Sequence, residues 1–244
     1  MSIMTPSIRG VLCLAALVAA ICLPAKAKAE MPGGETHWLV SADRLEYQSN
    51  EGTGLFVWDA QGWWGGDYDK LWIKSEGETK LRGGSVEEAE LQALYSRAIS
   101  PFWDIQFGLR HDFHPHPSRS YGAFSVQGLA PHWFDVDASA FISEEGDISA
   151  RLEVEYDLLL TQRLILQPRF ETNFAIQEVS ELGVGSGVNN VELDARLRYE
   201  ISREFAPYMG ISWTRKLGKT ADLTRAGGGS VDTASFLLGL KVWY

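Results

Sequence analysis

The chain has 244 residues and a net charge of −10, and 45% of its residues are hydrophobic. An acidic balance of this size argues against nucleic-acid binding, which requires a basic surface. After residue 29 no apolar run reaches the roughly 18 residues that indicate a membrane-spanning helix. The length that remains suits one large β-barrel or one to two ordinary domains.

Residues 1–29 have the organisation of a secretory signal peptide. A positively charged start is followed by an apolar run from Val11 to Leu23 and then by small residues up to Ala29. The apolar run is shorter than the roughly 20 residues that a membrane-spanning helix needs. We therefore expect export, with cleavage after Ala29 and cleavage after Ala27 as the alternative.

Glu30 to His37 form a short segment before the first expected strand. From residue 38 onward, apolar and polar side chains alternate with a period of two, which is the pattern of β-strands. Between Val191 and Ile201, for example, every second residue is apolar and every residue between them is charged. About twelve strands are expected, with ten as the alternative count: residues 38–47, 54–64, 69–75, 86–96, 101–111, 120–130, 132–142, 147–158, 162–176, 188–201, 205–216 and 233–244.

Strand and loop lengths favour a transmembrane barrel over a soluble β-sandwich. Alternation alone fits both folds, because the apolar face packs into a core in one and meets lipid in the other. The strands run about 10 residues, which is the length that crosses a bilayer at a tilt. Short turns also alternate with longer loops, which are expected at Glu76–Ser85, Asp112–Arg119, Gln177–Gly187 and Leu217–Asp232. We therefore predict an up-and-down antiparallel barrel over residues 38–244 in the outer membrane, with both termini in the periplasm.

The last expected strand carries an apolar stripe that ends on an aromatic residue at the C-terminus. The stripe consists of Phe236, Leu238, Leu240, Val242 and Tyr244. We expect it to face outer-membrane lipid and to serve as the signal for the barrel-assembly machinery. Aromatic residues near other strand ends, such as Trp38, Trp63 and Trp133, are expected to form the interfacial girdles.

The polar faces of the strands place acidic and basic side chains together inside the predicted barrel. Charges removed from water need partners, so the first interpretation is a lattice of salt bridges that fills a narrow lumen. The alternative is a polar path or a cation site. The residues with inward parity are Asp104, Arg110, Asp112, Arg151, Glu153, Glu155, Asp157, Arg169, Glu171, Glu192, Asp194, Arg196, Arg198 and Glu200.

One histidine cluster, formed by His111, His114 and His116, is the candidate metal site. Imidazole nitrogen suits Cu(II), although strand parity places His111 on the lipid side and the other two elsewhere. The alternative is that all three are solvated residues beside prolines. No serine with a base fixed beside it is recognisable, so no enzyme is expected and a lipid hydrolase at the rim is disfavoured.

Several blocks resemble the copper resistance protein B family. They include residues 151–169 and 199–208, together with Gln61–Gly66, Lys70–Lys74, Gln92–Arg97 and Gly128–Pro131. The resemblance covers roughly residues 38–244. It implies an outer-membrane barrel of bacterial copper tolerance that binds copper or passes it across the membrane and works with a periplasmic copper-handling protein.

The segment before the first strand departs from that family. Members often carry a Met- and His-rich periplasmic segment there, whereas residues 30–37 hold only Met31 and His37. Thioether ligands suit Cu(I), so a Met-rich copper store is not expected in this segment. The alternative function is a non-selective or structural barrel without metal specificity.

Overall fold

The computed structural model describes residues 36–50 and 53–244. The expected signal peptide, its cleavage site and most of the segment before the first strand lie outside the described residues. No helix in the described part is long and apolar enough to cross a membrane. The long strands are β1 (His37–Asn50), β2 (Thr53–Gly65), β3 (Asp69–Lys80), β4 (Val86–Ser100), β5 (Trp103–His114), β6 (Arg119–Ala130), β7 (Phe134–Ser143), β8 (Ile148–Tyr156), β10 (Leu164–Ala175), β11 (Gly187–Tyr199), β12 (Phe205–Lys216) and β13 (Asp232–Trp243).

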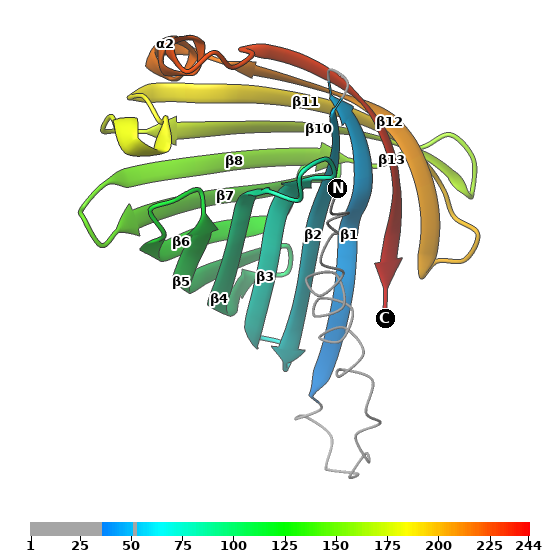
Figure 1. The fold of residues 1–244 in the computed structure, drawn as a ribbon. Helices are drawn as coiled ribbons and strands as arrows, with labels where there is room; N and C mark the ends of the chain where they lie inside the picture. The colour runs from blue at the N-terminus through cyan, green and yellow to red at the C-terminus, as the bar shows by residue number, and fades with distance from the viewer. Residues whose placement is uncertain (1–35, 51–52) are drawn as a thin grey trace, which may run out of the picture. The chain divides into compact units, whose positions relative to one another are not determined.

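These strands form a closed antiparallel barrel of twelve (Figure 1). Each strand pairs with its neighbour in the chain, and β13 pairs back onto β1, which leaves no open edge in the ring. The two-residue β9 (Leu158–Leu159) pairs with β10 and lies outside the ring. The predictions of the fold and of twelve strands are confirmed, and the alternative of ten strands is wrong.

The two ends of the barrel differ in their connections. At one end, the turn end, the chain crosses between strands in short turns such as residues 66–68 and 101–102. The other end, the loop end, carries the 3₁₀ helix η1 (Ser180–Leu182) and the helix α2 (Gly218–Ala226) in its two longest connections. Outer-membrane barrels have short periplasmic turns and longer external loops, so we assign the loop end to the outside.

Several expected boundaries are wrong. The strand expected at residues 86–96 continues to Ser100, and β5 continues to His114, which shortens the expected loop Asp112–Arg119. The first half of the predicted loop Glu76–Ser85 continues β3, which ends at Lys80. The alternation continues there, but Gly77 and Thr79 occupy the outward positions, so the stripe lacks the large apolar side chains that indicate a strand. The turn after β6 is also longer than the single residue expected, because His132 and Trp133 both adopt left-handed backbone conformations, with φ of 69° and 68°, before β7 begins.

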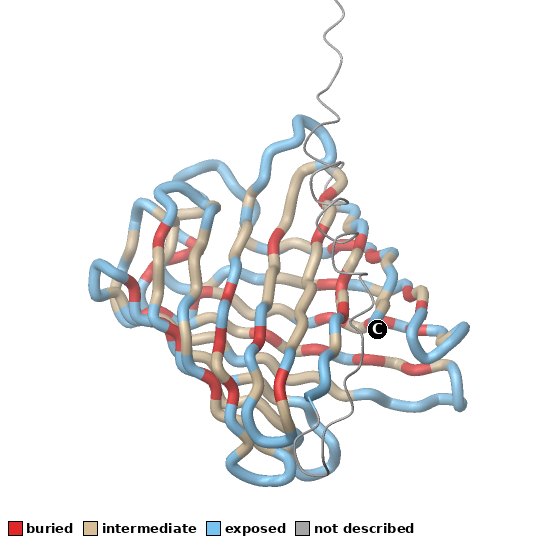
Figure 2. Tube along the Cα trace, turned by 90° about the horizontal axis from the view of Figure 1, so that it is seen from below, coloured by how far each residue is buried: buried red, intermediate tan, exposed pale blue. Residues whose placement is uncertain are grey.

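Along the strands, buried and exposed positions alternate (Figure 2). Outward positions hold large apolar side chains such as Leu109, 69% exposed, while inward positions hold polar side chains such as Gln106, 0% exposed. A soluble protein would bury the first set and expose the second. The inversion fits a barrel whose outer face meets lipid and whose inner face is filled by polar side chains.

The C-terminal residue closes the ring at the turn end. Tyr244 exchanges two backbone hydrogen bonds with Val40, at 3.0 and 2.8 Å, and its ring lies 5.4 Å from that of Trp38. Both aromatic side chains are exposed, as expected for an interfacial girdle. Trp63 differs from that expectation, because it faces inward and packs beside Trp72.

Candidate functional site

The residues expected to form the lumen lattice project from four strands and the turns that follow two of them. Each takes part in at least one ion pair of 3.9 Å or less. They lie on β5 (Asp104, Arg110, Asp112), on and just after β8 (Arg151, Glu153, Glu155, Asp157), on β10 (Arg169, Glu171), and on and just after β11 (Glu192, Asp194, Arg196, Arg198, Glu200).

Arg169 is the centre of the densest part of this network. Its guanidinium lies 2.6 Å from Glu153, 2.7 Å from Glu192 and 3.0 Å from Asp194. It also pairs with Glu155 at 3.6 Å and with its strand neighbour Glu171. Its side chain is only 1% exposed. One buried cation therefore pairs with carboxylates from three adjacent strands, and a partner of opposite charge is the condition under which buried charges are tolerated.

A second set of ion pairs crosses the lumen. Arg151 on β8 lies 2.8 Å from Glu76 on β3 and 2.9 Å from Glu90 on β4. β3 and β8 are five strands apart in the ring of twelve, so they form nearly opposite walls. Arg44 on β1 also pairs with Glu76, at 2.5 Å, and Arg110 on β5 pairs with Glu90, at 2.7 Å. We call Arg44, Glu76, Arg151, Glu90 and Arg110 the transverse chain.

Several charged residues that face the lumen were not predicted from the sequence. Glu76 was placed in a loop, so its inward parity was lost. On β1, a bulge between Ala42 and Arg44 interrupts the alternation. Because of that bulge, both Asp43 and Arg44 reach inward, where Asp43 accepts from Lys241 at 2.7 Å and Arg44 pairs with Asp59 at 3.2 Å.

Glu46, on the same strand, is fully buried and was also missed. It pairs with Arg196 at 3.2 Å and accepts a 2.9 Å hydrogen bond from the Tyr208 hydroxyl. Alternation counted from Trp38 and Val40, which both face outward, would place Glu46 outward as well, and the bulge reverses its direction. A charged residue on one strand also gives no indication of its partner, because Arg196 lies 150 positions away.

The wall formed by β3 to β7 is partly apolar. Trp72, Leu94, Ala123 and Phe141 point inward and form a buried cluster. The Arg110 guanidinium lies 4.5 Å from the centre of the Phe141 ring, which joins this cluster to the transverse chain by a cation–π contact. Apolar side chains therefore pack part of this wall, while polar side chains of the same strands, such as Lys74, Gln127 and Asp137, line the polar space of the lumen.

That polar space includes a cavity of about 170 Å³ on the turn side of the transverse chain. The end of the cavity nearest the loop end of the barrel is lined by Arg44, Glu76, Glu90 and Arg151. Asp112, which lies further toward the loop end, does not line the cavity. Such a volume has room for roughly ten water molecules. Eight carboxylates and five basic side chains line it, so the cavity is net acidic. A negatively charged, confined space attracts cations.

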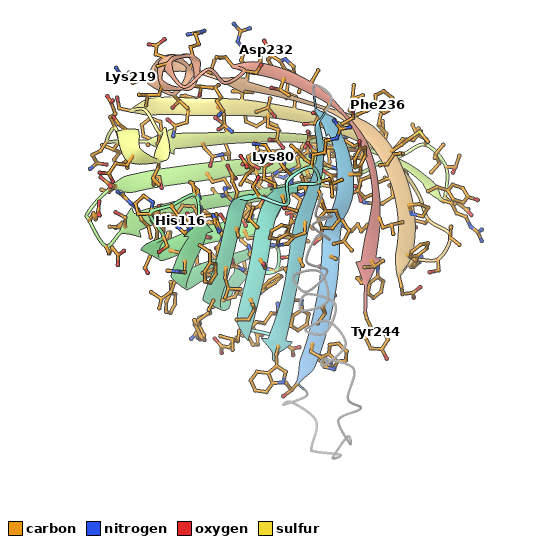
Figure 3. All side chains as sticks on the ribbon, viewed as in Figure 1. Lys80, His116, Lys219, Asp232, Phe236 and Tyr244 are labelled. Atoms are coloured by element: carbon orange, nitrogen blue, oxygen red, sulfur yellow. The ribbon has the colours of Figure 1, made fainter. Side chains whose placement is uncertain are left out.

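The histidine cluster is only partly brought together. His114 and His116 lie at the loop end, with ring centres 4.4 Å apart, and Figure 3 marks His116 there. His111 lies on the opposite face of β5, where its Nδ1 is 3.0 Å from the hydroxyl oxygen of Ser120. Among residues 36–50 and 53–244, no group of three or more His, Cys, Asp or Glu side chains is arranged to hold a metal ion.

The contact between His111 and Ser120 corrects the expectation that no serine has a base beside it. The two residues are register partners on β5 and β6, which sequence spacing alone does not reveal. A catalytic triad also needs a group that orients the histidine. In the described part of the chain, no carboxylate is hydrogen-bonded to His111; its other close contact is an edge-on packing against Phe113, with ring centres 4.6 Å apart. His111 and Ser120 lie on a lipid-facing stripe, where polar groups need hydrogen-bond partners within the protein. Their mutual hydrogen bond is therefore a sufficient structural reason for the contact.

Comparison with known proteins agrees with both the fold and the family resemblance. Among solved structures, the chain is similar to the NanC porin (TM-score 0.55, 12% identity, 84% of this chain and 99% of that one). It is also similar to the KdgM porin (TM-score 0.53, 9% identity, 84% and 98%). Identities this low support the outer-membrane barrel fold alone.

Similarity in sequence is much closer to copper resistance proteins. The chain is 44% identical over 208 residues to copper resistance protein B of Escherichia coli, covering 85% of this chain and 70% of that protein. It is 48% identical over 204 residues to the copper resistance protein B homolog of Pseudomonas syringae pv. tomato, covering 83% and 68%. The model of the copper resistance protein B precursor family matches residues 36–244. The chain therefore belongs to the copper resistance protein B family.

Proposed function

We propose that this barrel binds copper ions and passes them across the outer membrane through its acidic lumen. The observation that carries the proposal is the net acidic cavity inside a barrel of the copper resistance protein B family. Nitrogen and oxygen donors suit Cu(II), and the lumen supplies carboxylates while the loop end supplies imidazoles. Copper is the cargo in this proposal, and the lumen side chains set its path.

His114 and His116 are the proposed first contact for Cu(II) on the external side. Their rings are close enough to share one ion, and they lie at the end of the barrel that we assign to the outside. Two imidazoles leave the remaining coordination positions to water, so binding would be weak and reversible. Weak binding at an entrance is what conduction requires, because an ion must also leave the site.

Inside the cavity, carboxylates of β7 and β8 lie opposite one another. Asp135 faces Glu155, and Asp137 faces Glu153 in the strand register. Like charges placed directly opposite repel. Lys74 pairs with Asp137 at 2.9 Å, and Arg169 pairs with Glu153. The pair nearest the turn end, Asp135 and Glu155, is less neutralised, because Glu155 lies 3.6 Å from Arg169. A passing cation would relieve this repulsion, which makes the cavity the proposed second stop.

We also propose that the role is not enzymatic and that the turn end meets a periplasmic copper-handling protein. The porin-like fold and the family membership support a transport or binding role. A lipid hydrolysis assay on the folded barrel tests the enzymatic alternative, with Ser120→Ala as its control. Hydrolysis that depends on Ser120 would overturn this part of the proposal.

Cells with and without the gene provide the direct test. We expect loss of the gene to change both copper sensitivity and periplasmic copper content. Unchanged copper sensitivity and unchanged copper content would contradict the proposal. In planar bilayers, ion currents that are indifferent to copper would favour a non-selective barrel instead.

Equilibrium Cu(II) titration of the folded barrel tests the binding step. Replacing both His114 and His116 with alanine should weaken binding. His111→Ala is the matched control, because that histidine faces the lipid side and pairs with Ser120. Equal Cu(II) affinity in the unmodified chain, the double variant and His111→Ala would contradict a role for His114 and His116. Titration of Asp135→Asn would then test the cavity by itself.

A further inference from the structure

The outer face of the barrel carries a shallow apolar groove of about 410 Å³ across β11, β12 and β13. Its floor contains the small side chains of Ala195 and Ala234, and larger side chains such as Trp213 and Phe236 stand beside them. The next outward row toward the turn end is filled by the larger side chains of Leu197, Met209 and Leu238. The groove exists because two alanines occupy diagonal positions in rows that otherwise hold Leu, Ile, Trp and Phe.

Strand register places a charged row directly above this groove, toward the loop end. Arg215 is paired with Val191 on β11 and with Asp232 on β13. The next outward row toward the turn end contains Trp213 and Ala234, which belong to the groove. Figure 3 shows Asp232 at the end of β13 next to α2, with Phe236 further along the same strand.

Asp232 holds this charged row in place. One of its carboxylate oxygens accepts a 2.6 Å hydrogen bond from the Trp213 indole, and the other lies 3.6 Å from the Arg215 guanidinium. The side chains of Arg215 and Asp232 both remain about half exposed. Arg215 is therefore oriented above the groove, yet it still has N–H groups free for an external anion.

The charge of the neighbouring loop supports an anionic ligand. Residues 215–232 contain four basic side chains (Arg215, Lys216, Lys219 and Arg225) against two acidic ones, in a chain whose net charge is −10. The external connection at residues 144–147, between β7 and β8, holds only acidic charges. The loop over the strands that form the groove therefore differs from it in carrying an excess of positive charge.

We propose that the groove binds one phosphorylated glycolipid of the outer leaflet of the outer membrane. An acyl chain lies over Ala195 and Ala234, the Trp213 ring borders it at the interface, and a phosphate meets Arg215. Guanidinium groups recognise phosphate through paired, charge-assisted hydrogen bonds, and basic residues beside a membrane surface select anionic lipids. A second copy of the barrel fits less well, because a stable protein interface buries about 1,200 Å² or more, whereas this groove is small and lies below a charged row.

The test measures lipid bound to the folded full-length barrel by native mass spectrometry. The probes are a bisphosphorylated lipid A and the same glycolipid without phosphates. Two variants remove the proposed contacts: Arg215→Gln removes the phosphate partner, and Ala234→Phe fills the groove. Their matched controls are Arg82→Gln, on an exposed external turn, and Ala140→Phe, on the outward face of β7.

For Arg215→Gln we expect about tenfold weaker binding of the phosphorylated lipid, as loss of one charge-assisted contact implies, and little change for the dephosphorylated one. Ala234→Phe should weaken the binding of both lipids. The two controls should bind as the unmodified chain does, and the heat-modified mobility on gels verifies that every variant is folded.

Equal binding by Arg215→Gln and Arg82→Gln, or by Ala234→Phe and Ala140→Phe, would overturn the proposal. So would a dimer that is lost only in Ala234→Phe, because that result would assign the groove to a second copy. The proposal does not depend on copper transport, and these measurements leave that function untouched.

Discussion

Arg151 on β8 and Glu76 on β3 are 75 positions apart in the chain and meet at 2.8 Å across the lumen. Each also has a second partner of opposite charge: Glu90 for the arginine and Arg44 for the glutamate. The contact joins nearly opposite walls of the ring, so it both braces the barrel and narrows its interior. The transverse chain is therefore the candidate constriction of the lumen.

Replacing Arg151 with glutamine should raise ion conductance and cation selectivity. The substitution opens the transverse chain and makes the lumen more negative by one charge, while Glu76 keeps Arg44 and Glu90 keeps Arg110 as partners. Single-channel recording in planar bilayers, with reversal potentials in a salt gradient, measures both changes. The matched control is Arg97→Gln, since Arg97 is exposed at the turn end. Equal conductance in the two variants would show that the transverse chain is not the constriction.

Replacing Arg169 with methionine should destabilise the barrel strongly. The change leaves carboxylates of β8, β10 and β11 without their common cation, and removal of one partner from a buried ion pair costs about 3–5 kcal/mol. Urea unfolding in detergent, followed by tryptophan fluorescence, measures the loss. Arg163→Met, in an exposed turn, is the control. If both variants unfold at the same urea concentration, the network around Arg169 contributes no stability.

The inward apolar cluster should stabilise the barrel by burying apolar side chains, in addition to the ion pairs of the lumen. Phe141 is 2% exposed and packs with Leu94 and Trp72, so Phe141→Ala should cost about 3–5 kcal/mol. Phe124→Ala removes the same side chain from the lipid-facing side, where the residue is 51% exposed, and should cost less. Thermal unfolding in detergent compares the two. A larger loss for Phe124→Ala would mean that lipid-side contacts dominate.

Deletion of Tyr244 should reduce assembly in cells more than it reduces the stability of the folded barrel. The residue contributes two backbone hydrogen bonds to Val40 and one ring contact to Trp38, all at the edge of the ring. Its proposed main role, as the end of the stripe read by the assembly machinery, acts before folding is complete. Outer-membrane protein levels and refolding yield in detergent separate the two effects, and Tyr68→Ala is the control for loss of an exposed aromatic side chain. Equal losses in both measurements would indicate a structural role alone.

The sequence by itself determined the barrel, a strand number of about twelve and the inward direction of the lumen charges on β5, β8, β10 and β11. These properties depend on local alternation, because successive side chains of a strand point to opposite faces. It failed where that alternation is interrupted or weak: at the bulge beside Arg44, in the second half of β3 with Glu76, and at Trp63, whose neighbour Trp64 takes the outward position.

The partners of those charges were decided only by the tertiary structure. Arg151 meets Glu76, Arg196 meets Glu46, and His111 meets Ser120, because closing the ring fixes strand register and brings distant walls together. Parity states which way a side chain points, but not what lies across the lumen from it. For the same reason, the acidic cavity and the groove beneath Arg215 could not be located before twelve strands were set in register.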